Sequence, residues 1–237
     1  MKKILLTTVA ALLAGWSYLS NGIGVSLASE KAVLLPAPAL DAPAAGSVKE
    51  TAVFAGGCFW GVQAVFQHTQ GVLNAVSGYS GGDKSTATYS QIGSGRTGHA
   101  EAVEITYDPT KISYGKLLLI YFSVAHDPTT LNRQGPDTGT QYRSAIFYTN
   151  AGQKKVAESY VAQLDAAKVL SGRIVTQVAP LNAFYAAEAY HQDYAALNPR
   201  QPYIARFDLP KIANLKVLMP EVYRHKPMLV SQARIKG

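Results

Sequence analysis

Residues 51–61 read TAVFAGGCFWG, and the pattern changes in the middle of this stretch. Residues 51–55 have the composition of a short strand, whereas residues 58–68 can form a helix with one apolar face. The pair Gly56-Gly57 lets the backbone turn tightly and leaves the following sulfur uncrowded. A helix N-terminus has free N–H groups and a positive dipole end, which favour a thiolate. The stretch therefore predicts that Cys58 begins a helix directly after a strand, where its ionised form is favoured.

The spacing of apolar residues from this point outward predicts an α+β protein. Over residues 51–148 the order is strand, helix, strand, strand, helix, strand, with ranges 51–55, 58–68, 72–79, 100–107, a helix capped by Ser113 and reaching Ala125, and 142–148. This order is typical of the ferredoxin-like fold, a two-layer α/β sandwich with helices on one face of the sheet. Two long polar loops, before residue 100 and over 126–141, are expected to be functional. A helix capped by Asn150, a strand over 173–178 and a short helix over 186–197 follow.

The first 28 residues have the features of an export signal. A basic start precedes an apolar run from Ile4 to Trp16, and Ser26-Leu27-Ala28 offers small residues where a signal peptidase cuts. The run is shorter than the roughly 20 apolar residues of a membrane span, so we expect cleavage and no stable membrane insertion. The predicted location is periplasmic or secreted. The predicted organisation is a signal peptide at 1–28, a flexible Ala/Pro-rich linker at 29–49, one domain at 50–225 and a C-terminal tail at 226–237.

The charge of the chain gives no sign of a nucleic-acid partner. The net charge is +7, and it falls to +5 without residues 1–28, which contain Lys2 and Lys3 and no acid. The remaining basic residues are scattered, and the longest cationic run among them is Lys154-Lys155. Nucleic-acid binding normally needs a concentrated basic surface, so we expect none.

Cys58 is the only cysteine of the chain. Exported domains normally use cysteines in pairs, so an odd one indicates a reactive thiol; a buried cysteine that acts as a small hydrophobe is the alternative. Phe59 and Trp60 follow it directly. These rings belong either to the core or to the wall of an apolar pocket at the start of the helix. The residues alone leave both alternatives open.

Glu101 lies on the apolar face of a predicted strand. Alternate residues of a strand share a face, so Glu101 points the same way as Val103 and Ile105, while Glu104 points the other way. A carboxylate on that face is costly unless it is paired or neutral, and a neutral carboxyl can serve as a proton donor. A glutamate at a strand end that reaches solvent is the alternative.

Other motifs of the sequence give weaker evidence of a function. Residues 93–98, GSGRTG, match G-x-G-x-x-G but lead into a strand, so no helix N-terminus would hold a phosphate. The histidines are dispersed and there is no H-E-x-x-H, so no metal site is expected. A hydrolase that pairs Cys58 with His99 or His191 stays open on these residues.

Five blocks of the sequence resemble the A-type peptide methionine sulfoxide reductase family. They are GCFWG at 57–61, GYSGG at 78–82, SGRTGHAE at 94–101, Asp137 with GTQYRS at 139–144, and FYAAEAYHQDY at 184–194. The resemblance covers roughly residues 51–207, in the order and spacing of the family. It implies an enzyme that reduces methionine S-sulfoxide, free or in oxidised proteins, to methionine without a cofactor.

The resemblance also implies the catalytic residues. Cys58 would attack the sulfoxide sulfur as a thiolate, and Glu101 would give its proton to the sulfoxide oxygen. Tyr89 and Tyr142 occupy the positions of the two residues whose hydroxyls donate to that oxygen.

The substrate contacts follow from the same resemblance. Phe59 and Trp60 would hold the methyl group of the substrate, and Asp137 would position the polar side of the pocket. His99 and His191 match motif positions and are assigned only to supporting structure.

Many members of the family carry resolving cysteines toward the C-terminus, and this chain has none. The sulfenic acid left on Cys58 must therefore be reduced by an external thiol: a thioredoxin-like protein, a glutaredoxin or a small thiol. Two other hypotheses stay open beside the reductase. A Cys–His hydrolase would need a histidine as its base, and a non-catalytic binding domain should have lost part of the pocket.

Overall fold

A computed structural model describes residues 32–42 and 48–233. The predicted signal peptide at 1–28 lies outside these residues. Within them, no helix has the length and apolar character to cross a membrane. The same residues contain no group of three or more His, Cys, Asp and Glu side chains arranged to hold a metal ion.

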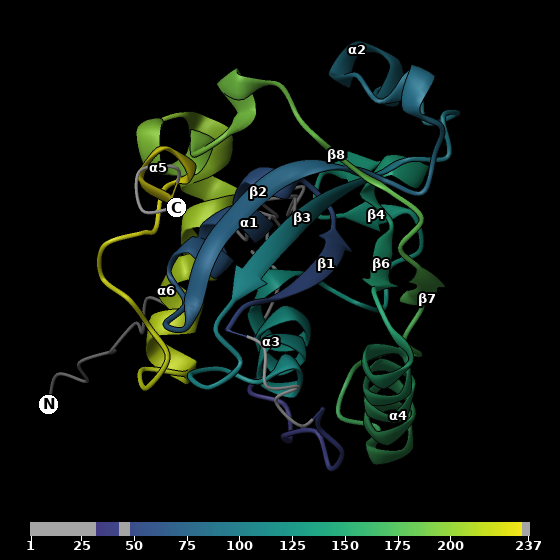
Figure 1. The fold of residues 1–237 in the computed structure, drawn as a ribbon, viewed down its shortest axis with the longest axis vertical. Helices are drawn as coiled ribbons and strands as arrows, with labels where there is room; N and C mark the ends of the chain where they lie inside the picture. The colour runs from purple at the N-terminus through teal and green to yellow at the C-terminus, as the bar shows by residue number, and fades with distance from the viewer. Residues whose placement is uncertain (1–31, 43–47, 234–237) are drawn as a thin grey trace, which may run out of the picture.

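Six strands form one sheet in the order β7-β6-β1-β3-β2-β8. Their bounds are β1 (Glu50–Gly56), β2 (Val72–Ser80), β3 (Ala100–Tyr107), β6 (Ser144–Tyr148), β7 (Gln177–Pro180) and β8 (Phe184–Ala186). The strands β6, β1, β3 and β2 pair with one another in antiparallel fashion, whereas β7 runs parallel to β6. Strand β3 lies between the two strands that α1 connects. Figure 1 shows β1, β3 and β2 side by side. This is the split β-α-β arrangement of the ferredoxin-like fold, so the predicted fold class is confirmed.

The longer helices pack on one face of this sheet, where they share its core. The longer ones are α1 (Phe59–Gln67), α3 (Tyr114–Ile120), α4 (Ala151–Ala167) and α6 (Leu209–Leu218), and the short ones are α2 (Tyr89–Ile92), α5 (Tyr194–Leu197) and α7 (Val230–Ala233). Phe54 and Ile105 of the sheet share one core with Val65, Leu118 and Tyr160 of the helices. The opposite face, which includes Ala102 and Phe147, packs against Leu181 of the β7–β8 connection and Phe184 of β8.

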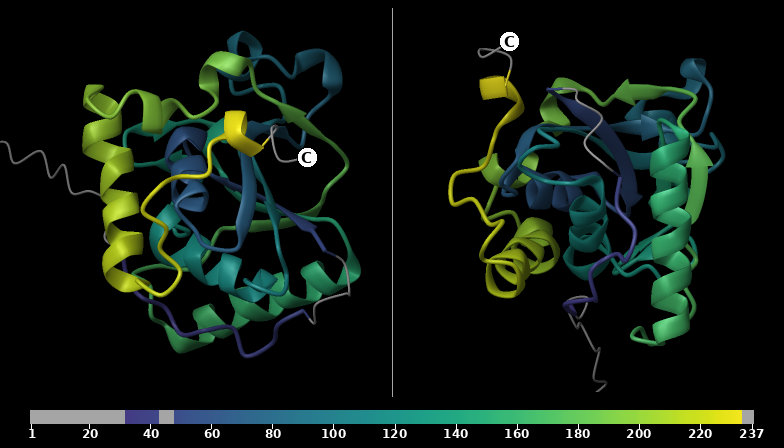
Figure 2. Two further views of the ribbon diagram at one scale, coloured as in Figure 1. Left: turned by 60° about the vertical axis from the view of Figure 1, so that its left-hand side comes forward. Right: turned by 60° about the horizontal axis from the view of Figure 1, so that its bottom comes forward.

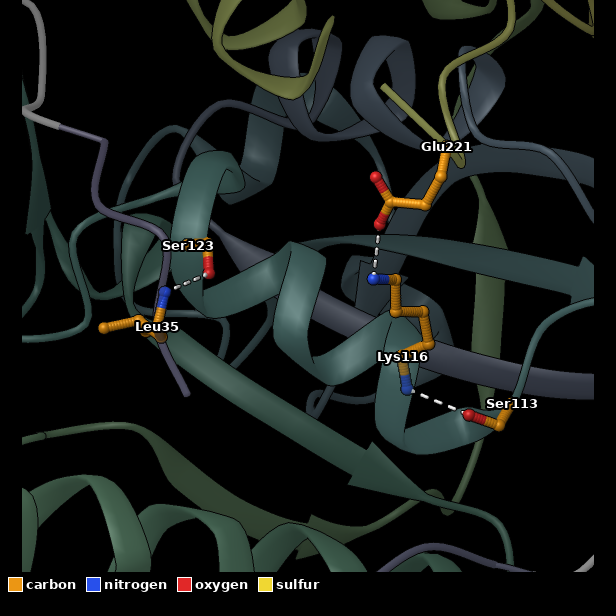
Figure 3. A network of polar contacts seen from close by, with 5 residues as sticks. All are labelled: Leu35, Ser113, Lys116, Ser123 and Glu221. Carbon is orange, nitrogen blue, oxygen red and sulfur yellow. Dashed lines mark hydrogen bonds and ion pairs between the residues drawn. The ribbon is translucent and has the colours of Figure 1, made fainter. Parts of the chain in front are cut away.

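Two predicted helix caps are confirmed. The Ser113 hydroxyl accepts the Lys116 N–H at 3.1 Å, and the Asn150 side chain accepts the Gln153 N–H at 2.9 Å. Each cap satisfies one backbone donor of a first turn that has no partner inside the helix. Figure 3 shows the Ser113 cap, together with the ion pair of 2.8 Å between Lys116 and Glu221.

The strand predicted at 142–148 begins two residues later, at Ser144. Tyr142 instead ends the 3₁₀ turn η3 (Thr140–Tyr142). The strand predicted at 173–178 begins later, as β7. The Ile174 N–H bonds instead to the Asp165 carboxylate, and the Val175 N–H bonds to the Pro128 carbonyl. Those bonds leave only the later residues free to pair with β6.

The helix predicted at 186–197 is wrong. This stretch holds the end of β8, the 3₁₀ turn η4 (Ala189–His191) and the short helix α5. The Gln192 side chain accepts the Ser77 N–H and donates to the Ser77 carbonyl, each at 2.9 Å. These bonds to β2 hold the chain extended at Gln192 and override its helical spacing.

Residues 32–42 lie against the domain, although the sequence predicted a flexible linker there. Leu35 is 3% exposed, and its N–H bonds to the Ser123 hydroxyl at 3.3 Å, as Figure 3 shows. The Tyr160 hydroxyl donates to the Pro36 carbonyl at 2.8 Å, and the Asp41 carboxylate accepts the Gly115 N–H at 2.7 Å. This segment therefore makes hydrogen bonds to α3, to the residues that follow it and to α4.

Replacing Leu35 with alanine should lower the free energy of unfolding by about 2 kcal/mol, since burial of a leucine side chain is lost. Leu34→Ala is a matched control because Leu34 is 53% exposed, and it should change stability by less than about 0.5 kcal/mol. Urea denaturation of both variants measures the difference. Equal stabilities would mean that this segment does not pack on the domain in solution.

The chain beyond residue 218 also contacts the domain. The Arg224 N–H bonds to the His68 carbonyl and the Met228 N–H to the Gln67 carbonyl, both at the C-terminal end of α1. The Val230 N–H bonds to the Asp193 carboxylate at 3.0 Å. Figure 2 shows this yellow segment passing along the blue α1. Residues 226–233, predicted as a tail, thus lie at the end of α1 opposite to Cys58.

Candidate active site

The turn between β1 and α1 depends on a glycine. Gly57 has a φ of +84°, and a Cβ atom there would lie 2.4 Å from the Cβ of Gln134. Gln134 is itself fixed, because its side chain accepts the Asp127 N–H at 3.0 Å and donates to the Asp127 carbonyl at 2.6 Å. Only glycine fits at position 57 without moving this pair. The turn brings Cys58 to the N-cap of α1, as the sequence predicted.

Glu101 reaches the same helix start from β3. Its carboxylate oxygen Oε2 accepts the Phe59 N–H at 3.0 Å, and the residue is only 3% exposed. Its neighbours on the strand, Val103 and Ile105, belong to the core beneath the helices, so the predicted face is confirmed. The alternative of a glutamate that reaches solvent is wrong.

The Glu101 carboxyl is held in its protonated form. Its pKa is raised to about 8, mainly by burial and also by the negative charges of Asp137 and Asp208, against the lowering effect of the hydrogen bond from the Phe59 N–H. At neutral pH this carboxyl therefore carries a proton that it can donate.

The Cys58 thiol does not have the low pKa that its place at a helix N-terminus predicted. Burial raises its pKa well above the ordinary value of a thiol, and the charges of Glu101 and Asp208 act in the same direction. The backbone N–H of Trp60 lowers the pKa, as expected at a helix start, but its effect is smaller. Removal from water thus outweighs the helix end, and the resting residue is a thiol.

A cavity of about 180 Å³ opens onto Cys58. All the residues that the sequence predicted for the site line it, and one further residue, Tyr203, joins them. The full lining is Cys58, Phe59, Trp60, Tyr89, Glu101, Asp137, Tyr142 and Tyr203.

The two predicted hydroxyl donors come from loops on either side of the cavity. Tyr89 begins α2 and is 39% exposed, whereas Tyr142 ends the turn η3. Burial raises the pKa of both phenols, and the charge of Glu101 adds to the rise. Both therefore keep their hydrogens at any physiological pH and remain donors.

Trp60 forms one wall of the cavity. Its indole stacks on the Tyr194 ring at 4.0 Å with 15° between the planes, and it meets the edge of the Tyr203 ring at 6.2 Å. The Tyr203 hydroxyl donates to Oδ2 of Asp137. The wall is thus apolar on the Trp60 side and polar at Asp137.

Tyr194 and Tyr203 were not predicted as site residues. Tyr194 falls in the last sequence block that resembles the reductase family, so that block held a signal. Tyr203 stands between Pro202 and Ile204, outside every block. Only the path of the chain after α5 brings it beside Asp137.

Among the described residues, no histidine lines the cavity at Cys58. His99 bonds to the Gly82 N–H and the Asp83 carbonyl, and His126 bonds to the Tyr121 carbonyl and the Ser144 hydroxyl. His191 accepts the Trp60 indole N–H. The arrangement offers a proton donor, not a base, beside the thiol, so it does not support a Cys–His hydrolase.

Comparisons with known proteins agree on one family. The family described as peptide methionine sulfoxide reductase matches residues 50–218. A peptide methionine sulfoxide reductase MsrA 2 of Mesorhizobium japonicum is 62% identical over 184 residues, 78% of this chain and 94% of that protein. The solved methionine sulfoxide reductase A of Corynebacterium diphtheriae is similar with a TM-score of 0.56 and 38% identity, covering 74% of this chain and 92% of that one. The solved reduced form of Mxr1 from Saccharomyces cerevisiae is similar with a TM-score of 0.62 and 30% identity, covering 70% of this chain and 94% of that one.

Proposed function

Because the chain belongs to the A-type peptide methionine sulfoxide reductases and reduces methionine S-sulfoxide, we propose that Cys58 and Glu101 carry out this reaction at the start of α1. One observation supports the proposal above all. The hydrogen bond of 3.0 Å from the Phe59 N–H holds the Glu101 carboxyl, which burial keeps protonated, at the helix start that carries the only thiol of the chain.

In the proposed reaction the Cys58 sulfur attacks the sulfoxide sulfur while Glu101 gives its proton to the sulfoxide oxygen. The thiol proton supplies the second hydrogen, so the oxygen leaves as water. Water then adds to the Cys58 sulfur, methionine is released, and Glu101 regains its proton. Two electrons pass from the cysteine sulfur to the substrate sulfur, and Cys58 ends as a sulfenic acid.

The other residues of the cavity hold the substrate in the proposed mechanism. Tyr89 and Tyr142 donate to the sulfoxide oxygen, and their raised pKa values support this role because both stay protonated. Phe59 and Trp60 contact the methyl group. Asp137 accepts from the polar part of the substrate, supported by its hydrogen bond with Tyr203, which orients it.

Recycling of Cys58 requires external thiols, because the chain has no second cysteine. One thiol condenses with the sulfenic acid to form a mixed disulfide and water, and a second thiol releases Cys58 as a new disulfide forms. We propose a thioredoxin-like protein as the donor, since a dithiol supplies both steps from one molecule.

We also propose that the protein works outside the cytoplasm. The basic start and the apolar run of residues 1–16 support a cleaved signal at 1–28 ahead of the reductase domain. The thiol donor must then be available in a compartment where thiols are mostly oxidised.

Without a reductant, the enzyme should form about one mole of methionine per mole and then stop, because one thiol supplies one reduction. Dimedone should trap the sulfenic acid as a single adduct on Cys58. Methionine quantification and enzyme mass after a quenched reaction with methionine S-sulfoxide measure both quantities. The R epimer serves as the blank, and added dithiothreitol should restore continued turnover. A yield near two moles with no adduct would contradict the single-thiol mechanism.

A further inference from the structure

His191 lies behind the cavity, among the rings that form its wall. It ends the turn η4 and is 2% exposed. Its imidazole centre is 4.3 Å from the ring of Tyr89, 5.1 Å from that of Phe59 and 5.8 Å from that of Trp60. All three of these residues line the cavity at Cys58.

One hydrogen bond connects His191 to this wall. The indole Nε1–H of Trp60 donates to Nδ1 of His191 at 3.2 Å. An indole nitrogen only donates, so Nδ1 must be unprotonated and the imidazole hydrogen sits on Nε2. Nε2 is buried and has no hydrogen-bond partner in the part of the chain that the structure describes. The polar contact made by this buried ring is therefore directed to Trp60.

This bond restrains a motion that the ring contacts of Trp60 leave free. Tyr194 stacks on the indole face with 15° between the planes, and parallel rings can slide and turn over one another. A hydrogen bond at the indole nitrogen fixes the rotation of the ring within its plane, because such bonds weaken steeply off their axis.

We propose that His191 is a positioning residue that, through Nδ1, fixes the Trp60 indole and so sets how tightly the cavity holds the methyl group of the substrate. The inference rests on the proposed function, in which Trp60 contacts that methyl group. His191 touches neither the sulfur nor the oxygen that react. Its loss should therefore weaken substrate binding and leave the chemical step almost unchanged.

Asparagine and leucine form a matched pair for the test, because they have nearly the same shape and only asparagine has a hydrogen-bond acceptor near the position of Nδ1. His191→Leu should raise the half-saturating concentration of methionine S-sulfoxide in single turnover about tenfold, the usual effect of one lost hydrogen bond. The plateau rate should change less than about threefold. His191→Asn should stay within about threefold of the wild type in both quantities.

A second measurement reads Trp60 directly. The chain has two tryptophans, so in a Trp16→Phe background the emission comes from Trp60 alone. His191→Leu should shift the emission maximum of this residue, and His191→Asn should leave it near the wild-type value. If the leucine variant does not fold, His191→Phe, which keeps a ring but has no acceptor, takes its place.

The Trp60→Phe background separates this bond from a general loss of packing. Without an indole N–H, the asparagine and leucine variants of His191 should become equal in half-saturating concentration. If the asparagine and leucine variants already have equal half-saturating concentrations with Trp60 present, the proposed role of His191 is wrong, although the enzyme still works. If the wild-type chain itself forms no methionine in single turnover, the proposed function fails instead.

Discussion

Cys58→Ser should abolish turnover, to less than about one thousandth of the wild-type rate, because serine offers neither an ionisable thiol nor a sulfur that can take up oxygen. The change removes the nucleophile from an otherwise intact cavity. No other cysteine exists to replace it. Methionine formation with dithiothreitol present, over a range of enzyme concentrations, measures the residual rate.

The same variant should keep its fold. Cys58 is the N-cap of α1 and makes no cap bond with its side chain in the described structure, whereas serine is among the best N-cap residues. The gain of a cap offsets the cost of a buried hydroxyl, so the free energy of unfolding should stay within about 1 kcal/mol of the wild type. Thermal unfolding provides the control. Wild-type turnover in a folded Cys58→Ser variant would show that another group reduces the sulfoxide.

The parts of the fold that the sequence predicts well are those where local pattern and tertiary packing agree. The strand at 100–107 was predicted with its observed bounds, because alternation, burial and the following Asp108-Pro109 all indicate the same element. The turn at Gly57 was predicted because its φ of +84° is a local demand that glycine alone meets easily.

The parts that failed depend on contacts between residues far apart in the chain. The helix that the spacing of 186–197 predicted does not form, because Gln192 makes hydrogen bonds to Ser77. Tyr203 lines the cavity only because the chain turns back after α5, and no local pattern records that path. The packing of residues 32–42 on the domain depends on the burial of Leu35, which stands in an Ala- and Pro-rich stretch that suggested a linker.

The pKa of Cys58 was missed for an electrostatic reason. The sequence indicates the helix end, whose N–H groups stabilise a thiolate, but it does not give the depth of burial or the number of carboxyls nearby. In the structure, burial and the charges of Glu101 and Asp208 outweigh the helix end. If Glu101 is itself protonated, its part of this repulsion disappears. The acid form of Glu101 thus makes the adjacent thiol easier to ionise as well as supplying the proton.

Glu101→Gln should lower the plateau rate of the sulfoxide step by about 10²-fold or more, the usual scale for loss of a general acid. Glutamine has nearly the shape of a protonated glutamate, and its carbonyl oxygen can still accept the Phe59 N–H that Glu101 accepts at 3.0 Å. The cavity should therefore keep its form and its substrate affinity. Single-turnover formation of methionine over a range of sulfoxide concentrations separates the rate from the affinity.

The pH dependence identifies the proton donor more sharply than the loss of rate. Because burial raises the pKa of Glu101 to about 8, its acid form predominates below that pH, and the wild-type plateau rate should fall as the pH rises through about 8. Burial raises the pKa of the Cys58 thiol, and its ionisation would create the stronger nucleophile, so its titration does not produce this fall. The residual rate of Glu101→Gln should show no such fall.

Stability should follow the same titration with a predictable sign. The carboxyl of Glu101 has a pKa of 4.5 when unfolded and about 8 when folded, so its contribution to stability is complete below about pH 4.5 and is lost as the pH rises toward 8. Glu101→Gln has no proton to lose, so it should gain stability relative to the wild type as the pH rises from 5 to 9. Urea denaturation of both proteins across that range measures the difference between their free energies of unfolding at each pH.

The rates decide the identity of the proton donor. A plateau rate that is unchanged in Glu101→Gln, with a wild-type rate that does not fall near pH 8, would assign the proton to a tyrosine of the cavity instead.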